Sequence, residues 1–332
     1  MDPRKFAMTV PVAPSMTAPS RFRILSLDGG GVKGAYSAAV LKEIEEATGK
    51  RIVDSFDLVA GTSTGGIIAL GLALGRTAAD LLAFYQTRGG LIFPSTGVGQ
   101  RWWSTLRRLI KPKFGAEALD SAFAEVFGDR TLGEASCRLL IPSYDAVAGD
   151  VHVFKTRHHE RVLQDHKRRA AEVARATSAA PTYLPLFASS WGQRFLDGGV
   201  WANCPSAIAV LEATAVLGVP LDAIQLLSIG TTTEAFSIDD RAAGGGFMQY
   251  GLSIVDLLQQ AQVVGSWAQT RLLLRDRAYR ISSVVRPNRF ALDDARHIGS
   301  LVALGLRDGR HHALKVKEIF LDAPAPTFAP VP

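Results

Sequence analysis

Residues 56–74 read Phe-Asp-Leu-Val-Ala-Gly-Thr-Ser-Thr-Gly-Gly-Ile-Ile-Ala-Leu-Gly-Leu-Ala-Leu and divide into three parts. An apolar run of strand length comes first, and an apolar run of helix length comes last. Between them, Gly61-Thr62-Ser63-Thr64-Gly65 has the Gly-x-Ser-x-Gly form of a nucleophile elbow, a sharp turn from a strand into a helix. Because the glycines remove side chains where the backbone crowds, the pattern predicts an exposed nucleophilic hydroxyl at Ser63.

Strand-like and helix-like segments alternate along the rest of the chain, which predicts a mostly parallel sheet covered by helices on both faces. We expect a flexible tail over residues 1–20, a catalytic domain over 21–235, and a helical C-terminal part of the same domain over 236–325. Strands are expected at 23–27, 56–60, 138–143, 151–155, 194–196 and 225–229. Helices are expected at 35–47, 66–74, 78–86, 116–127, 172–180, 206–217 and 249–274, with one or two more within 295–320.

A glycine-rich loop, Gly29-Gly30-Gly31-Val32-Lys33-Gly34, directly follows the first expected strand. Acyl transfer builds negative charge on a carbonyl oxygen, and fixed backbone N–H groups stabilise that charge. The amides of Gly29, Gly30 and Gly31 are therefore candidates for an oxyanion hole, with Gly34 supporting the turn. The same string fits the dinucleotide pattern Gly-x-Gly-x-x-Gly, which is weak by itself, and its spacing excludes a Walker-type phosphate loop.

The candidate base is Asp197, which follows an apolar strand and precedes Gly198 and Gly199. Burial away from other charges would raise the basicity of this carboxylate, so direct proton transfer from Ser63 is expected. The alternatives are an ordinary Asp-Gly turn or a histidine base. No histidine follows the order serine, acid, histidine at a strand end. Four histidines lie in charged segments, where a solvated surface position is expected: His158, His159, His311 and His312.

Composition limits the partners and the compartment. The formal net charge of +6 suits a nucleotide or an acidic membrane surface, although it also suits plain solubility. The basic residues are spread out, so no nucleic-acid polymer is expected. Cys137 and Cys204 offer neither a disulfide framework nor zinc spacing and are expected to be buried. Residues 1–20 lack the apolar core of a secretion signal, so we expect a cytoplasmic protein, peripheral to the inner face of the membrane.

Residues 100–114 mix Trp102 and Trp103 with five basic residues. Aromatic and cationic side chains together suit a lipid interface, which makes these tryptophans candidates for membrane contact. The alternative is an amphipathic surface helix whose tryptophans pack on the core.

The chain resembles the patatin-like phospholipases over residues 22–235, because the glycine loop, the Gly-x-Ser-x-Gly and the Asp-Gly-Gly stand in that family's order. The resemblance implies a three-layer α/β/α fold, Ser63 as nucleophile, Asp197 as base, and the amides of residues 29–31 as the oxyanion hole. It also implies phospholipase A activity without calcium or any other metal or cofactor. One departure is Cys204, where the family more often has a second asparagine. Three further stretches look similar: 177–181, 201–205 and 227–231.

Some bacterial members of this compact size are antiphage effectors switched on by cyclic dinucleotides. The similar appearance and the basic charge balance suggest such an activator, with residues 232–323 as the expected place for control. Two alternatives stay open: a general carboxylesterase or acyltransferase with the same Ser–Asp pair, and a catalytically inactive nucleotide- or membrane-binding module. An oligomer is also compatible with the sequence.

Overall fold

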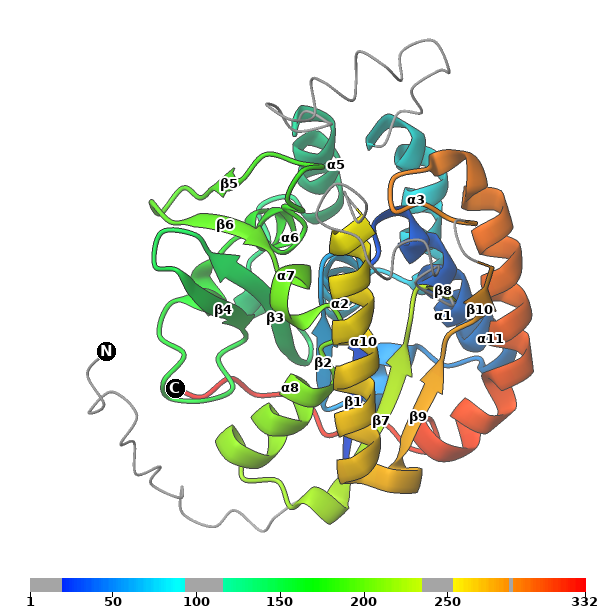
Figure 1. Ribbon diagram of the computed structural model, residues 1–332. Helices are drawn as coiled ribbons and strands as arrows, with labels where there is room; N and C mark the ends of the chain where they lie inside the picture. Colours follow the sequence, from blue (N-terminus) through cyan, green and yellow to red (C-terminus); the bar gives the residue numbers. More distant parts are fainter. Residues whose placement is uncertain (1–19, 93–115, 235–252, 287–288) are drawn as a thin grey trace, which may run out of the picture.

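The central element is a mostly parallel sheet with helices on both of its faces (Figure 1). The computed structural model describes residues 20–92, 116–234, 253–286 and 289–332. Within these ranges the sheet order is β5-β6-β3-β2-β1-β7-β9, with β4 paired to β3 off this path. Its strands are β1 (Phe22–Leu27), β2 (Leu58–Gly61), β3 (Arg138–Asp145), β4 (Asp150–Lys155), β5 (Phe187–Ala188), β6 (Arg194–Asp197), β7 (Ile224–Ile229) and β9 (Ala278–Ile281).

The parallel core of this sheet positions the motifs. Strand β1 pairs in parallel with both β2 and β7, and Leu27 is in register with Gly61 on one side and Ile229 on the other. The carboxyl ends of these strands therefore lie side by side, which brings the glycine loop and the elbow to the same edge. Strands β4 and β6 run antiparallel to β3, and β5 runs antiparallel to β6.

Alternate residues of β1 face opposite sides of the sheet, as strand geometry requires. Leu25 and Leu27 belong to a hydrophobic cluster that includes α1, α2, α3, α5, α6 and α11, whereas Phe22 and Ile24 pack with α8 and α10. This arrangement confirms the three-layer α/β/α fold. The helices are α1 (Gly34–Thr48), α2 (Thr64–Ala73), α3 (Ala78–Ile92), α5 (Glu117–Phe127), α6 (Ala170–Thr177), α7 (Gly199–Ala202), α8 (Ser206–Leu211), α10 (Ser253–Leu274) and α11 (Ile298–Phe320).

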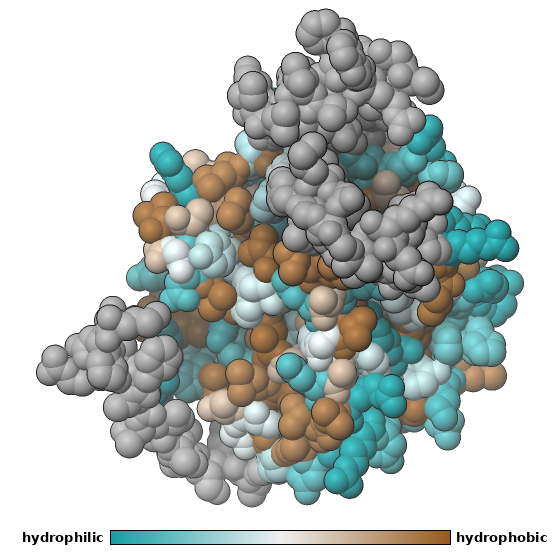
Figure 2. All heavy atoms as spheres, in the orientation of Figure 1, coloured by the Kyte–Doolittle hydropathy of each residue, from teal (hydrophilic) through white to brown (hydrophobic). Residues whose placement is uncertain are grey.

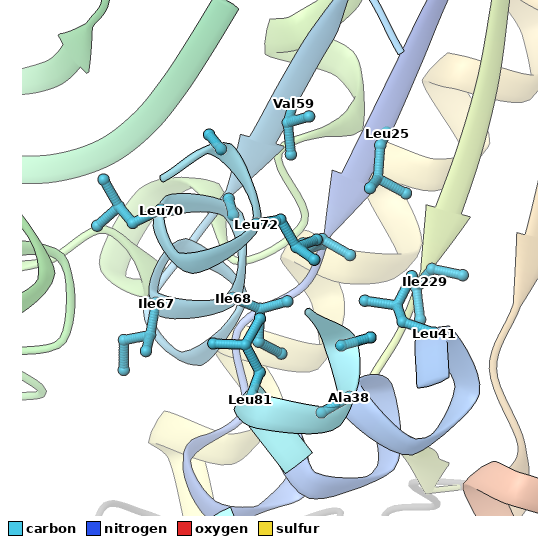
Figure 3. Packing of buried hydrophobic residues seen from close by; sticks show 14 of the residues in the cluster. Leu25, Ala38, Leu41, Val59, Ile67, Ile68, Leu70, Leu72, Leu81 and Ile229 are labelled. Atoms are coloured by element: carbon cyan, nitrogen blue, oxygen red, sulfur yellow. The ribbon is translucent and has the colours of Figure 1, made fainter. Parts of the chain in front are cut away.

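Figure 3 shows the first cluster, in which Leu25 and Val59 of the sheet lie near Ile68 and Leu72 of α2. Every residue of α2 is buried, which explains why its sequence is apolar on all sides. Helix α1 ends where the sequence predicts, because Gly49 adopts the left-handed conformation with φ 67°.

The C-terminal part differs from the expected all-helical segment. Strand β9 pairs in parallel with β7 and so extends the main sheet, and β10 (Val284–Val285) pairs with β8 (Thr233–Glu234). These strands are too short to give a periodic sequence signal. After α11, the chain runs back beneath the sheet until the N–H of Val331 donates to the carbonyl of Arg157 (Figure 1).

Apolar and polar residues intermix on the face that carries α10 (Figure 2). Leu258, Val264 and Leu272 of α10 are 57%, 55% and 80% exposed. Among the described residues, no helix is both long enough and apolar enough to cross a bilayer.

Candidate active site

Ser63 sits at the turn between β2 and α2 with φ 54° and ψ −121°, a conformation that residues with a side chain rarely adopt. The two motif glycines make this turn possible. A Cβ at Gly65 would lie 2.2 Å from the carbonyl oxygen of Leu27, and one at Gly61 would lie 2.2 Å from the carbonyl oxygen of Gly65. The local geometry is therefore that of a nucleophile elbow.

The hydroxyl of Ser63 donates a hydrogen bond to Oδ2 of Asp197 over 2.7 Å. Ser63 is 8% exposed and Asp197 is 5% exposed, so the pair lies in a buried position next to the surface. Burial raises the pKa of Asp197 from 3.8 to about 6, although the hydrogen bonds from Gly199 and Ser63 lower it. A carboxylate with this pKa is a stronger base than a solvated aspartate and is still ionised at neutral pH.

Asp197 is held in place from both sides. It ends β6 where that strand pairs with Ser143 of β3, and its Oδ1 accepts the N–H of Gly199 over 2.6 Å. Gly198 allows the close approach of the neighbouring strand, because a Cβ there would lie 2.3 Å from the carbonyl oxygen of Pro142. The backbone around the carboxylate is thus fixed before any substrate binds.

Thr177 links this part of the site to the elbow. Its hydroxyl oxygen accepts the N–H of Ser63 over 3.0 Å, and its hydroxyl donates to the carbonyl of Pro142 over 2.6 Å. The stretch 177–181 was a sequence signal for the family, but no role for Thr177 was expected from it.

The glycine loop passes directly beside Ser63, since a Cβ on Gly29 would lie 3.3 Å from the Cβ of Ser63. The N–H of Gly29 donates to the carbonyl of Asn203 over 2.9 Å, so it is not free to bind an oxyanion. The amides of Gly30 and Gly31 have no acceptor among the described residues. The expected group of three amides is therefore reduced to two. Gly34 begins α1 behind them.

Arg280 of β9 fixes the start of this loop. Its guanidinium donates to Oδ2 of Asp28 over 2.5 Å and to the hydroxyl of Ser228 over 2.5 Å, and it lies over the ring of Trp267. Burial alone would lower the pKa of Arg280, but the charges and hydrogen bonds of Asp28 and Cys204 together raise this pKa above its usual value. No sequence motif indicates a role for Arg280, because β9 lies outside the stretch that resembles the family.

The prediction of a surface position is wrong for His158, one of the four histidines expected there. It is buried, its Nε2 lies 2.9 Å from Oε1 of Glu212, and its Nδ1 lies 3.0 Å from the hydroxyl of Thr156. Its neighbours in the sequence are charged, but Glu212 comes from a distant π-helical turn (Glu212–Val216), which the local sequence does not reveal. Among the described residues, no histidine contacts the Ser63 hydroxyl or the Asp197 carboxylate.

Three further expectations concern other positions. Cys137 and Cys204 are buried and unpaired, as predicted. Trp102 and Trp103 lie outside the described residues, so their proposed membrane contact stays a prediction. Most of the expected flexible tail also lies outside them.

The fold and the geometry around Ser63 are those of a serine hydrolase. A family model described as patatin-like phospholipase matches residues 25–210. The chain therefore belongs to the patatin-like phospholipase family.

Individual relatives extend this similarity. A cGAMP-activated phospholipase of Pseudomonas aeruginosa is 32% identical over 309 residues, which cover 90% of this chain and 89% of the relative. A cGAMP-activated phospholipase of Vibrio cholerae is 34% identical over 251 residues, which cover 70% of each chain. Among solved structures, VipD from Legionella pneumophila aligns with a TM-score of 0.45 and 12% identity, covering 90% of this chain and 67% of that one.

Proposed function

We propose that this protein is a lipid acyl hydrolase of the phospholipase A type that cleaves the fatty-acyl esters of membrane glycerophospholipids. The observation that carries the proposal is the 2.7 Å hydrogen bond from Ser63 to a buried Asp197 carboxylate with a pKa of about 6. Family membership supports the choice of a lipid ester as substrate.

In the acylation step, Asp197 accepts the proton of the Ser63 hydroxyl while the serine oxygen attacks the ester carbonyl carbon. The negative charge that forms on the carbonyl oxygen is stabilised by the free N–H groups of Gly30 and Gly31. When the tetrahedral intermediate collapses, the ester C–O bond breaks and the leaving lysolipid oxygen takes the proton from Asp197. The fatty acyl group remains on Ser63.

Deacylation repeats the sequence with water as the nucleophile. Asp197 accepts a proton from the water as its oxygen attacks the acyl-enzyme, and the proton then returns to Ser63 as the fatty acid leaves. A single carboxylate serves both steps, because its pKa of about 6 lets it take up and release a proton near neutral pH.

The two relatives above are named as cGAMP-activated, which supports a cyclic dinucleotide as the activator of this chain as well. The net charge of +6 suits an anionic ligand of this kind. Such control would keep the hydrolase inactive until an infection signal appears, which fits a role in antiviral defence. Access to lipid esters also requires peripheral contact with a membrane, for which Trp102 and Trp103 remain our candidates.

The test is mass spectrometry of phospholipid vesicles incubated with the protein and cyclic GMP-AMP. The wild type should release fatty acid and lysolipid, and Ser63→Ala and Asp197→Ala should each lower release by at least about 10⁴-fold. Ser190→Ala, a change at an exposed serine, is the matched control and should behave as wild type. Near-normal release by Asp197→Ala would refute the Ser–Asp pair. Transfer of the acyl group to an added alcohol in place of water would favour an acyltransferase.

A further inference from the structure

Asn203, the residue that follows α7, lies against the glycine loop. Its backbone carbonyl accepts the N–H of Gly29 over 2.9 Å. Its side chain approaches the same glycine closely, since a Cβ on Gly29 would be 2.2 Å from Oδ1 of Asn203 and 3.3 Å from the Cβ of Ser63. The carboxamide of Asn203 therefore packs on the glycine that itself packs on the nucleophile.

A second glycine opens the same space from the side of the base. A Cβ on Gly199 would lie 3.0 Å from Oδ1 of Asn203 and 3.0 Å from Oδ1 of Asp197. Gly29 and Gly199 thus leave room for this carboxamide next to both members of the Ser–Asp pair. Because its oxygen faces the two glycines, its nitrogen is the side-chain atom left to meet a ligand.

The side chain of Asn203 is buried without a partner. The residue is 8% exposed, and it lines a cavity of about 290 Å³ together with Gly29 and Gly30. Its carboxamide has no hydrogen-bond partner among the residues that the structure describes. Burying a polar group without a partner is costly, and such groups are rare away from functional sites. An unpartnered amide at this place therefore points to a bound ligand.

The proposed oxyanion hole has a position for one more donor. Only the amides of Gly30 and Gly31 are free in it, because the carbonyl of Asn203 takes the N–H of Gly29. Asparagine side chains serve in oxyanion holes beside backbone N–H groups, since a carboxamide N–H is a donor that needs no change of protonation. The residue that occupies the amide of Gly29 thus offers a side-chain donor in its place.

We propose, on the basis of the function proposed above, that Asn203 is a further catalytic residue. Its Nδ2–H donates to the ester carbonyl oxygen as negative charge forms there, together with the N–H groups of Gly30 and Gly31. The donor acts in acylation and in deacylation, because both tetrahedral intermediates carry an oxyanion. Asn203 itself gains and loses no proton.

The first test is steady-state hydrolysis of p-nitrophenyl butyrate by the full chain with cyclic GMP-AMP. Asn203→Ala should lower kcat by about 10²–10³-fold, the usual loss for one oxyanion donor, and change KM by less than about threefold. Because the amide that it removes has no partner in the folded protein, the melting temperature should stay close to that of wild type.

Two further variants separate the donor from the shape and polarity of the cavity. Asn203→Asp keeps the shape of the side chain and removes both N–H groups, so it should lose at least as much activity as Asn203→Ala. Gln259→Leu is the matched control, because this amide lines the same cavity from α10 and does not lie against Gly29 or Gly199. It should change kcat by less than about twofold, since it removes no oxyanion donor.

An inhibitor that mimics the intermediate tests the oxyanion directly. The oxygen of Ser63 adds to the carbonyl carbon of an alkyl trifluoromethyl ketone, Asp197 takes the proton, and the ketone oxygen becomes an anion. Its Ki should rise in Asn203→Ala by about the factor by which kcat/KM falls. The Ki of the corresponding secondary alcohol, which forms no oxyanion, should change by less than about twofold.

Normal kcat in Asn203→Ala, with Ser63→Ala inactive, would overturn the role of Asn203 and leave the proposed hydrolase standing. Normal kcat in Asn203→Asp would show that shape matters and the donor does not. Equal losses in Asn203→Ala and Gln259→Leu would assign the effect to the polarity of the cavity, and either result also overturns the proposal. A wild type that cleaves neither this ester nor any phospholipid would overturn the proposed function as well.

Discussion

The carboxyl of Asp197 has two hydrogen-bond partners and almost no contact with water. Because burial raises its pKa to about 6, the base form is lost as the pH falls through that value. We expect kcat/KM on a non-ionising ester to rise with a slope near one in log units below about pH 6 and to level off above it. A pH–rate profile between pH 4 and 9 checks this. A plateau that already begins near pH 3.8, the pKa of a solvated aspartate, would show that burial does not raise the pKa of the catalytic base.

The same pKa shift predicts a cost in stability. In the folded state Asp197 keeps its proton up to about pH 6, whereas in the unfolded chain it loses the proton near pH 3.8. The free energy of unfolding therefore falls as the pH rises between those two values. The difference between the folded and unfolded pKa values corresponds to a loss of about 3 kcal/mol in the free energy of unfolding, at ~1.4 kcal/mol per pKa unit.

Asp197→Asn should therefore be inactive yet more stable than wild type at pH 8, by about 1–3 kcal/mol. Its advantage should shrink to less than about 1 kcal/mol at pH 4, where Asp197 is protonated in the folded state and the unfolded carboxyl is still partly ionised. Urea unfolding at the two pH values measures this. An equal effect at both pH values would mean that the change acts through packing and not through ionisation.

Ser63 and Asp197 could be predicted from the sequence because each lies in a short motif in which close backbone contacts require glycine. The partners of these motifs could not be predicted in the same way. The N–H of Gly29 donates to the carbonyl of Asn203 and not to an oxyanion, and the imidazole of His158 forms a hydrogen bond with the carboxylate of Glu212. Both pairings join residues more than fifty positions apart. Local composition cannot show such contacts.

At the scale of elements, the glycine loop is held by parts of the chain that follow it by more than 200 residues. Arg280 of β9 pairs with Asp28, and the carbonyl of Leu292 accepts the N–H of Val32 over 2.9 Å. The hydroxyl of Thr231, after β7, donates to the carbonyl of Gly29 over 3.1 Å. The free amides of the loop thus depend on strands β7 and β9 for their position.

Arg280→Leu tests this dependence, because it leaves the carboxylate of Asp28 buried without its counter-ion. The free energy of unfolding should drop by about 3–5 kcal/mol. Because Arg280 is a positioning residue for the glycine loop, kcat on p-nitrophenyl butyrate should fall by about tenfold with less change in KM. Denaturant unfolding and steady-state kinetics give the two values.

Two further variants sharpen the result. Asp28→Asn combined with Arg280→Leu removes both charges and should recover part of the lost stability. Arg271→Leu, on the exposed surface of α10, should change stability by no more than about 0.5 kcal/mol. A stable Arg280→Leu protein with normal kcat would show that the loop keeps its position without this ion pair.

The elements that the sequence predicts well are the long ones with a clear apolar pattern. Helices α1 and α2 and strands β1 and β7 all lie within one or two residues of their expected bounds. The expected helix at 206–217 is less regular, since α8 ends at Leu211 and continues as a π-helical turn. Glu212 begins that turn and pairs with Lys155 as well as His158. These contacts join Glu212 to residues more than fifty positions away, and no local pattern encodes them.

At the scale of the whole molecule, the C-terminal part completes the core and is not a separable addition. Gly305 of α11 lies so close to α1 that a Cβ there would be 2.5 Å from the carbonyl oxygen of Tyr36. The ring of Phe320 stacks on Phe56 with centroids 5.9 Å apart, and both side chains are buried. Control by a ligand bound in this region would act on a packed unit, so it can reach the glycine loop through β9.

Phe320→Ala should therefore destabilise the entire protein and not only α11. Removing a buried phenylalanine leaves a cavity that costs about 3–5 kcal/mol. If the molecule unfolds as one unit, loss of helical circular dichroism and loss of ester hydrolysis should shift together to lower denaturant concentration. Leu314→Ala is the control, because this side chain lies on the same helix and is 78% exposed. The substitution should change the free energy of unfolding by no more than about 0.5 kcal/mol. If activity in Phe320→Ala instead survived after helix signal had been lost, α11 would unfold independently, and the C-terminal part would be a module whose packing the active site does not need.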